Sequence, residues 1–451
     1  MRWIVKLPQV ALRSQRGFTL TELMASLTAG VIIAGAVVGI SRAASETFHE
    51  ETRTLTAQSG SRQSMEQLSL DLMRAGYMST GNIQTDPSVA KPPGELMNNL
   101  IPNQYVGLRR LASVHLVVGG SKAATDPQST FAGLNPDTIE LGGNFTTTDQ
   151  FPIREIQPTT GNCQTILLQT DSPAMWRLIS TAAGIDQTPL INAFKPGPVT
   201  SSRQFIVRIQ DSSGRYQYAP TCPQADAVGI NGGVPFIKIA TNSMGVGILT
   251  AEQTKTTGGA SGYGAGMLIN PVQIVRWSIT NAPPDFAVAA MTPKADASKF
   301  YLQRELVDAV GRTDVSTTQV VSEYVVDLKF GFTVEDGPVD ASNTSHKLFA
   351  FDDPLNGTYA YDVSAPPPAT APPSGPQRVR SVRVRLATRA QVADRDVAIP
   401  VTPAGPAGQR FMYRYCTASA AAQCSDRSLS YARVRTLTNE IALSNQSRWF
   451  Y

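Results

Sequence analysis

Charged side chains are scarce in this sequence: Asp, Glu, Lys and Arg make up 16% of its 451 residues, against roughly 25% in an ordinary soluble domain. Four of the 39 basic residues precede residue 17, with no acidic residue among them: Arg2, Lys6, Arg13 and Arg16. The other 35 are matched by 35 acidic residues. The chain beyond residue 17 is therefore formally neutral, which argues against general nucleic-acid binding.

Histidine is even scarcer, with three residues that lie far apart: His49, His115 and His346. None has the companion residues of a metal or catalytic motif. The segment GGASGYGAG at 258–266 lacks the Gly-Lys-Ser/Thr ending of a phosphate loop, which favours a flexible loop. We therefore expect no enzyme activity, no metal site and no cofactor.

The four cysteines, Cys163, Cys222, Cys416 and Cys424, form no C-x-x-C pair and have no histidine near them, so a zinc site is not expected. An even number of cysteines in an exported chain predicts two disulfides. Sequence order favours the pairs Cys163–Cys222 and Cys416–Cys424. Three connectivities remain open, as does the alternative of four free thiols.

One long apolar run stands out, from Phe18 to Ile40, with Glu22 as its one charged residue. As a helix it would be about 34 Å long, enough to cross a hydrocarbon core of roughly 30 Å. The positive residues before it predict that its N-terminal side stays cytoplasmic and that the rest of the chain is exported. A signal anchor, or a secretory signal cut near Ala43-Ala44-Ser45, is the alternative.

The junction before this run carries a more specific pattern, RGFTLTELMASL. It resembles the class III leader of prepilins, with Gly17 before the cleaved bond, Phe18 as the new N-terminus and Glu22 as the fifth mature residue. The resemblance implies cleavage between Gly17 and Phe18 by a prepilin peptidase, followed by N-methylation of Phe18. It also implies that Glu22 pairs with the N-terminal amine of a neighbouring subunit, because each charge alone is costly in an apolar filament core.

The helix is predicted to continue from about Thr19 to Ala75, because apolar residues such as Leu68 and Leu72 recur at helical spacing and Gly76 is a stop signal. We therefore divide the chain into a leader (1–17), a transmembrane or filament-core helix (18–40), an amphipathic continuation (41–77) and a head (78–451). The fold class expected is α+β: a pilin-like long N-terminal helix packed on a mainly antiparallel β-sheet.

The head reads as short strands between turns. The strands expected are 114–120, 137–143, 165–170, 204–210, 234–240, 272–280, 300–306, 323–334, 379–388 and 431–437. Residues 80–110 and 240–265 and a Pro-rich run at 364–376 are predicted to be insertions or surface loops, and an inserted β subdomain would account for the size of the head. The segment SMEQLSLDLMRAGY and the order VQIVRWSIT, FYLQREL, VSEYVVDLKFGFTV resemble the PilW family of minor pilins, which is related to the J-type pseudopilins of type II secretion.

This resemblance implies a minor pilin of a priming or tip complex, whose partners are the prepilin peptidase and other minor and major pilins that pack along the helix. Before assembly the subunit would sit in the bacterial inner membrane with its head in the periplasm, and afterwards in a pilus at the cell surface. An adhesin or ligand-binding head and a type II secretion pseudopilin remain alternatives. The Arg-rich strand at 378–386, with Arg433 and Arg435, raises DNA binding, but a solvated strand face whose arginines meet nearby acids is the preferred interpretation.

Overall fold

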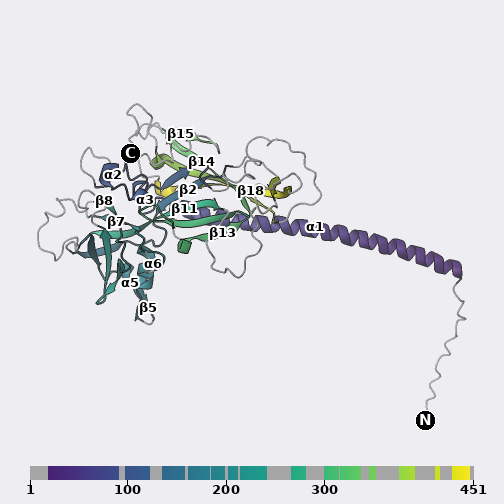
Figure 1. Cartoon of the computed structure of the whole chain (residues 1–451), viewed down its shortest axis with the longest axis horizontal. Coiled ribbons are helices and arrows are strands. Elements are labelled where there is room, and N and C mark those ends of the chain that lie inside the picture. Colours follow the sequence, from purple (N-terminus) through teal and green to yellow (C-terminus); the bar gives the residue numbers. More distant parts are fainter. Residues whose placement is uncertain are drawn as a thin grey trace, which may run out of the picture. The chain divides into compact units, whose positions relative to one another are not determined.

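The computed structural model describes residues 19–90, 97–121, 135–157, 161–182, 184–198, 202–211, 214–240, 266–280, 299–313, 315–336, 345–351, 375–391, 412–416 and 429–446. It divides into two units, Met1–Leu55 and Thr56–Tyr451, and each is described by itself. Figure 1 labels the helices and strands and colours them along the sequence.

In the first unit the described residues form a single helix, the start of α1 (Leu20–Arg74). Its segment Leu20–Ser45 is long and apolar enough to cross a membrane, since its length as a helix is about 39 Å. The large apolar side chains here are exposed, among them Ile32 at 72% and Ile40 at 71%. Such a surface is stable in lipid or against neighbouring apolar helices rather than in water.

In the second unit the rest of α1 becomes amphipathic. Met65, Leu68 and Leu72 are buried, as their spacing of three to four residues predicts. The helix ends at Arg74, and Gly76 follows in the left-handed conformation with φ of +75°, which costs glycine little. The Gly76 N–H donates to the Gly142 carbonyl at 2.8 Å. The predicted helix end is thus confirmed.

Two larger sheets follow. The first has strand order β1-β2-β11-β3-β4-β10-β9, with β12 and β7 also paired to β11, β13 to β12 and β8 to β7. Its strands are β1 (Val114–Val117), β2 (Thr138–Gly143), β3 (Phe151–Ile156), β4 (Cys163–Leu168), β7 (Ile206–Gln210), β8 (Tyr216–Pro220), β9 (Val228–Asn231), β10 (Val234–Ala240), β11 (Leu268–Thr280), β12 (Tyr301–Val307) and β13 (Gln319–Glu323).

The second sheet has the order β15-β14-β16-β18-β17. Its strands are β14 (Val325–Asp336), β15 (Ser345–Leu348), β16 (Val379–Arg389), β17 (Met412–Cys416) and β18 (Leu429–Ala442). A small hairpin joins β5 (Ser180–Thr181) to β6 (Gly184–Ile185). All strand pairs of the described residues are antiparallel, so the expected α+β fold with an antiparallel head is confirmed.

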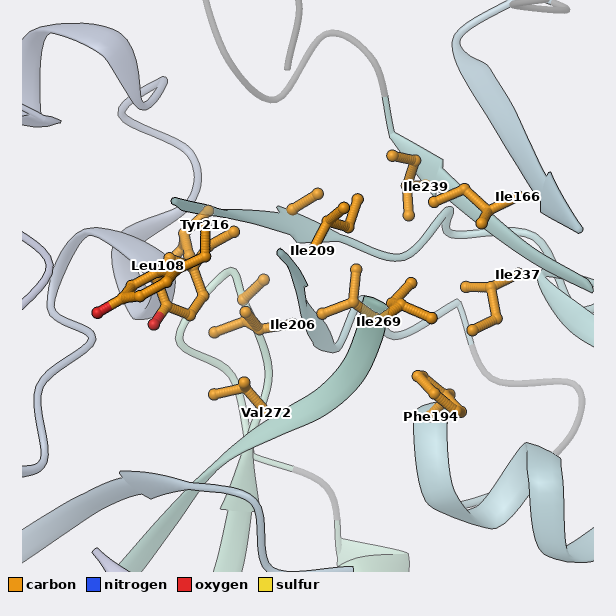
Figure 2. Close-up of a cluster of buried hydrophobic side chains, with 14 of the residues drawn as sticks. Leu108, Ile166, Phe194, Ile206, Ile209, Tyr216, Ile237, Ile239, Ile269 and Val272 are labelled. Carbon is orange, nitrogen blue, oxygen red and sulfur yellow. The ribbon is translucent and has the colours of Figure 1, made fainter. Parts of the chain in front are cut away.

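The two largest hydrophobic cores among the described residues lie in this unit, and β11 contributes to both. Val275, Trp277 and Ile279 pack in the core that also holds the buried side chains of α1 and of the five-stranded sheet. Ile269 and Val272, earlier in the same strand, pack in a second core with β4, β7 and β10, which Figure 2 shows. The strands and segments whose side chains form the second core are called below the module built on the second core.

Some parts of the head differ from the sequence-based expectation. Residues 80–90 and 97–110 are not a surface loop, because their side chains contribute to the second core, and an insertion stays a prediction: Ile83, Val89, Met97, Leu100, Ile101, Tyr105 and Leu108 are buried there. They include the short helices α2 (Met97–Leu100) and α3 (Val106–Arg109). Two further helices, α5 (Pro173–Ile179) and α6 (Thr188–Phe194), were not expected. The strand predicted at 323–334 is interrupted at Tyr324, whose φ is +58°. Of the predicted insertions or surface loops at 240–265 and 364–376, residues 241–265 and 364–374 lie outside the described residues. At the described ends, Ala240 closes β10 and Pro376 is buried in a short 3-10 helix.

Candidate assembly site

The N-terminus of α1 is closed by a reciprocal pair of hydrogen bonds between Thr19 and Glu22. The Thr19 N–H and hydroxyl donate to Glu22 Oε2 at 3.1 and 2.9 Å, and the Glu22 N–H donates to Thr19 Oγ1 at 3.3 Å. Thr19 directly precedes the first helical residue, Leu20. This is a capping box, in which a Thr and a Glu three residues later satisfy two backbone N–H groups that the first helical turn leaves unpaired.

The capping box uses one of the two carboxylate oxygens of Glu22 as a hydrogen-bond acceptor. In the part of the chain that the structure describes, its hydrogen bonds all go to Oε2, and its side chain is exposed. Oε1 therefore remains available to a donor from another molecule. Gly17 and Phe18 lie outside the described residues, so the expected cleavage and methylation site stays a prediction. The Thr-x-x-Glu signal of a capping box is present in the sequence, although it was not among the predicted features.

At the other end of α1, polar contacts attach the helix to the sheets. Asp71 accepts hydrogen bonds from Trp277 Nε1 at 2.9 Å and from Arg304 Nε at 2.7 Å. Asn445, just beyond β18, donates to the Met73 carbonyl at 2.8 Å. These contacts join the end of α1, which belongs to the second unit, to β11, β12 and the C-terminal region.

A buried charge network lies on the face of β1, β2 and β11 opposite the helix-bearing core. Glu140 accepts from His115 Nδ1 at 3.0 Å and from Arg276 at 2.9 and 2.7 Å. Burial alone would raise the pKa of Glu140, but the hydrogen bond from His115 and the charges of Arg276, His115 and Arg110 outweigh it and hold this pKa at about 2. Glu140 is thus a structural carboxylate that stays ionised at neutral pH.

The other two histidines are His346 in β15 and His49 in α1, and the side chains of both lie outside the described residues. Within the described residues no group of three or more His, Cys, Asp or Glu side chains is placed to hold a metal ion.

The arginines of β16 meet acids and carbonyl groups. Arg380 Nε lies 2.6 Å from Glu335 Oε2, and Arg385 Nη2 lies 3.0 Å from Asp327 Oδ2. Arg383 donates to the Phe349 carbonyl. The expected pairing with nearby acids is thus present at Arg380 and Arg385. The expected solvation is wrong at Arg385, which is buried.

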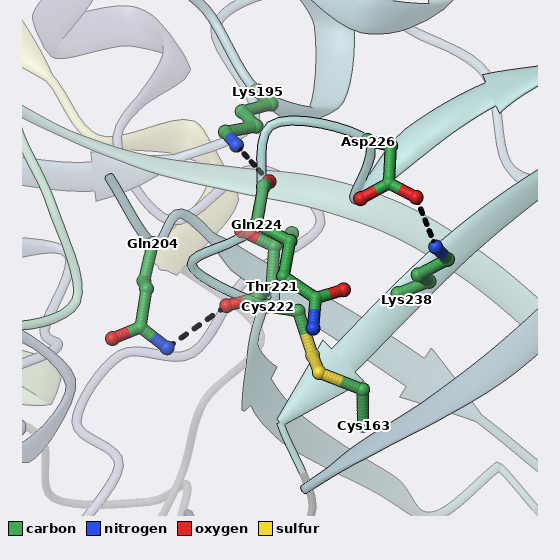
Figure 3. Close-up of a disulfide and its surroundings, with 8 residues drawn as sticks. All are labelled: Cys163, Lys195, Gln204, Thr221, Cys222, Gln224, Asp226 and Lys238. Carbon is green, nitrogen blue, oxygen red and sulfur yellow. Dashed lines mark hydrogen bonds and ion pairs between the residues drawn. A yellow bond between two sulfur atoms is a disulfide. The ribbon is translucent and has the colours of Figure 1, made fainter. Parts of the chain in front are cut away.

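Cys163 and Cys222 form a disulfide with a Cα–Cα distance of 6.2 Å, the pairing that sequence order favours. It joins the start of β4 to the segment that follows β8 (Figure 3). Cys416 ends β17, where its side chain is not described, and Cys424 lies outside the described residues. A bond between these two stays a prediction.

Comparison with known families gives a match at the start of the chain. Residues 12–38 match the prokaryotic N-terminal methylation motif, and this range includes Gly17, Phe18 and Glu22. The motif supports a type IV pilin or pseudopilin. It implies processing by a prepilin peptidase and association with other pilins, and the exposed apolar segment of α1 fits an inner-membrane anchor that later enters a filament. No curated protein and no solved structure matches the chain.

Proposed function

We propose that this pilin-type chain is a minor pilin of the PilW kind, which takes part in type IV pilus assembly within a priming or tip complex. The observation that carries the proposal is the methylation motif at 12–38, continuous with a helical segment, Leu20–Ser45, whose apolar side chains are exposed. A prepilin peptidase would cut between Gly17 and Phe18, and Phe18 would then be N-methylated. The exposed apolar surface would pack first in lipid and then against the helices of other pilins.

Glu22 would direct this packing. Because its Oε2 caps its own helix, Oε1 is the atom left for the methylated amine of Phe18 in a neighbouring subunit. Neutralising the two charges against each other lowers the cost of placing both in an apolar filament core. Pairing at one fixed atom would also set the axial register between adjacent helices.

The size of the head supports a position at the end of a filament. The unit Thr56–Tyr451 holds the two large hydrophobic cores described above, and a compact unit of this length has a radius of gyration of roughly 21 Å. Packed helices lie only about 8–10 Å apart. Heads of this size on successive subunits would compete for space along a filament, whereas one subunit at the tip meets no such limit.

The test is deletion of the gene, with complementation by wild-type protein and by the Glu22→Ala and Glu66→Ala variants. Deletion is expected to abolish surface filaments. Wild-type protein and the exposed control Glu66→Ala should restore them. The Glu22→Ala variant should be cleaved normally but should not enter filaments. Intact filaments on deletion would contradict a priming role. Intact filaments that fail to adhere would favour an adhesin, and loss of secreted enzymes without loss of filaments would favour a type II secretion pseudopilin.

A further inference from the structure

The module built on the second core carries a groove that the assembly role does not use. Alternate side chains of β4 and β10 point to opposite faces of the sheet. Ile166 and Ile237 are fully buried in the core, whereas Leu167 and Phe236 are half-buried on the other face. Over that face lies a groove of about 770 Å³, bounded by β4, β9, β10, α6 and the loop before β9. This size is in the range of small-molecule binding sites.

The loop that bounds the groove, residues 221–227, is held from several sides, as Figure 3 shows. The disulfide fixes Cys222 to β4, and Gln204 donates to the Thr221 carbonyl at 3.0 Å. Lys195, which is 1% exposed, donates to the Gln224 carbonyl. Asp226 pairs with Lys238 of β10. A wall fixed in this way loses little conformational entropy when a ligand binds.

The lining of the groove indicates the chemistry of its ligand. It has one aromatic ring, that of Phe236, on a floor of aliphatic side chains. Polar side chains surround this floor, and several carry amide or hydroxyl groups that both donate and accept hydrogen bonds: Gln157, Thr165, Gln187 and Asn231. The charged residues of the lining, Asp226 and Lys238, pair with each other. The groove therefore suits a neutral molecule that has hydroxyl groups and an apolar face.

An extended peptide that adds to the sheet as a further strand is a less suitable ligand. β9 is the outermost strand of the path through this sheet, and a free strand edge would bind an extended peptide through its backbone. The N–H of Ile230 in β9, however, donates to the side chain of Gln187 at 3.3 Å. Since this edge group is already bonded, recognition falls to the side chains of the groove.

We propose that the groove is a carbohydrate-binding site for a neutral oligosaccharide of about two or three sugar units, a size that matches its volume. A sugar ring would stack its C–H face on Phe236, while its hydroxyl groups exchange hydrogen bonds with Asn231 and Gln157. On a pilus tip such a site would let the subunit attach to glycans. The binding itself does not depend on the pilin role, so the two proposals fail separately.

The test uses the full-length protein in lauryldimethylamine oxide micelles, because alkyl glycoside detergents would compete for the site. An array of neutral and acidic oligosaccharides is screened first, and the best neutral member is then titrated by calorimetry. We expect at least tenfold weaker binding for Phe236→Ala and for Asn231→Ala, and retained binding for Phe236→Trp. The matched control is Trp176→Ala, since Trp176 is an exposed aromatic residue of α5 that does not line the groove.

Thermal unfolding of each variant separates loss of binding from loss of folding. Asn231 is exposed at the end of β9, so its replacement keeps the test valid even where Phe236→Ala unfolds the module. The proposal is overturned when no neutral oligosaccharide on the array binds, when acidic glycans bind in preference, or when Asn231→Ala and folded Phe236→Ala bind as tightly as wild type. Normal pilus assembly by these variants would leave the pilin proposal untouched.

Discussion

The carboxylate of Asp71 accepts a hydrogen bond from the indole Nε1 of Trp277, and the two atoms lie 2.9 Å apart. Trp277 is fully buried in the core that α1 shares with the sheets. Arg304 contacts both oxygens of the same carboxylate, at 2.7 and 3.3 Å. One acidic side chain of the helix thus satisfies donors from two adjacent strands, so the C-terminal part of α1 is locked into the sheets by polar as well as apolar contacts.

We predict that Asp71→Ala lowers the free energy of unfolding of the second unit by about 2–4 kcal/mol, because it leaves the Trp277 N–H and the Arg304 guanidinium without their acceptor. The measurement is chemical unfolding followed by Trp fluorescence. Glu66→Ala, on the exposed face of the same helix, is the control and should change stability by no more than about 0.5 kcal/mol. Equal effects of the two variants would show that the Asp71 contacts do not stabilise the unit.

The capping box predicts that the hydroxyl group of Thr19 stabilises the first turn of α1. Thr19→Ala removes the acceptor of the Glu22 N–H, at a cost of about 1 kcal/mol. Hydrogen exchange of the Glu22 amide in micelles should therefore accelerate about fivefold, while Thr19→Ser should exchange like wild type. Unchanged protection in Thr19→Ala would mean that Glu22 is held by something other than this cap.

The lowered pKa of Glu140 predicts how the stability of the fold depends on pH. Its folded pKa of about 2 lies below its ordinary value of 4.5, so its ionised form stabilises the fold above pH 4.5. This contribution is lost as the pH falls from about 4.5 towards 2. Glu140→Gln should be less stable than wild type at pH 7 and should lose less stability on going from pH 5 to pH 3.

The matched control for Glu140 is Glu323→Gln. Glu323 pairs with Lys299 at 2.8 Å, but its side chain is 51% exposed, and exposed pairs contribute little. Its pH profile should follow that of wild type. A Glu140→Gln profile parallel to wild type through this range would contradict the assigned role of the buried network.

Removal of the disulfide between Cys163 and Cys222 is predicted to lower the stability of the fold. Cys163 and Cys222 are 59 residues apart in sequence, and closing a loop of that size stabilises the folded state by up to about 4 kcal/mol. Replacing both with Ala should lower the unfolding temperature of the module built on the second core, measured by calorimetry. Replacing Cys416 and Cys424 with Ala is the comparison, and peptide mapping without reduction shows whether those two are bonded in the wild type.

Much of the fold could be predicted because its signals are local. The end of α1 is marked by Gly76, and the strands of the head alternate apolar and polar residues, as Val382 and Val384 do around Arg383 in β16. Helix α5 was missed although Ser172 caps it and Pro173 occupies its first turn, which is a readable start signal. Its seven residues are too few for apolar periodicity to stand out.

The contacts between distant segments could not be predicted. Asp71 and Arg304 are 233 residues apart, and no local pattern connects a helix carboxylate to one strand arginine among many. The division of β11 between two cores likewise depends on which strands pair with each half of it, and pairing over long separations is set by the complete fold. At the candidate assembly site, by contrast, Gly17, Phe18 and Glu22 lie close together in the sequence, so the methylation motif itself indicates their chemistry.

Prepilin processing underlies every step of the proposed assembly role, and it would leave its mark on the N-terminus of the mature protein. Mass spectrometry of the protein isolated from its native membrane should find an N-terminal peptide that begins at Phe18 and carries one methyl group on its α-amine. A mature protein that begins elsewhere, for example after Ala43 or Ala44, would contradict prepilin processing.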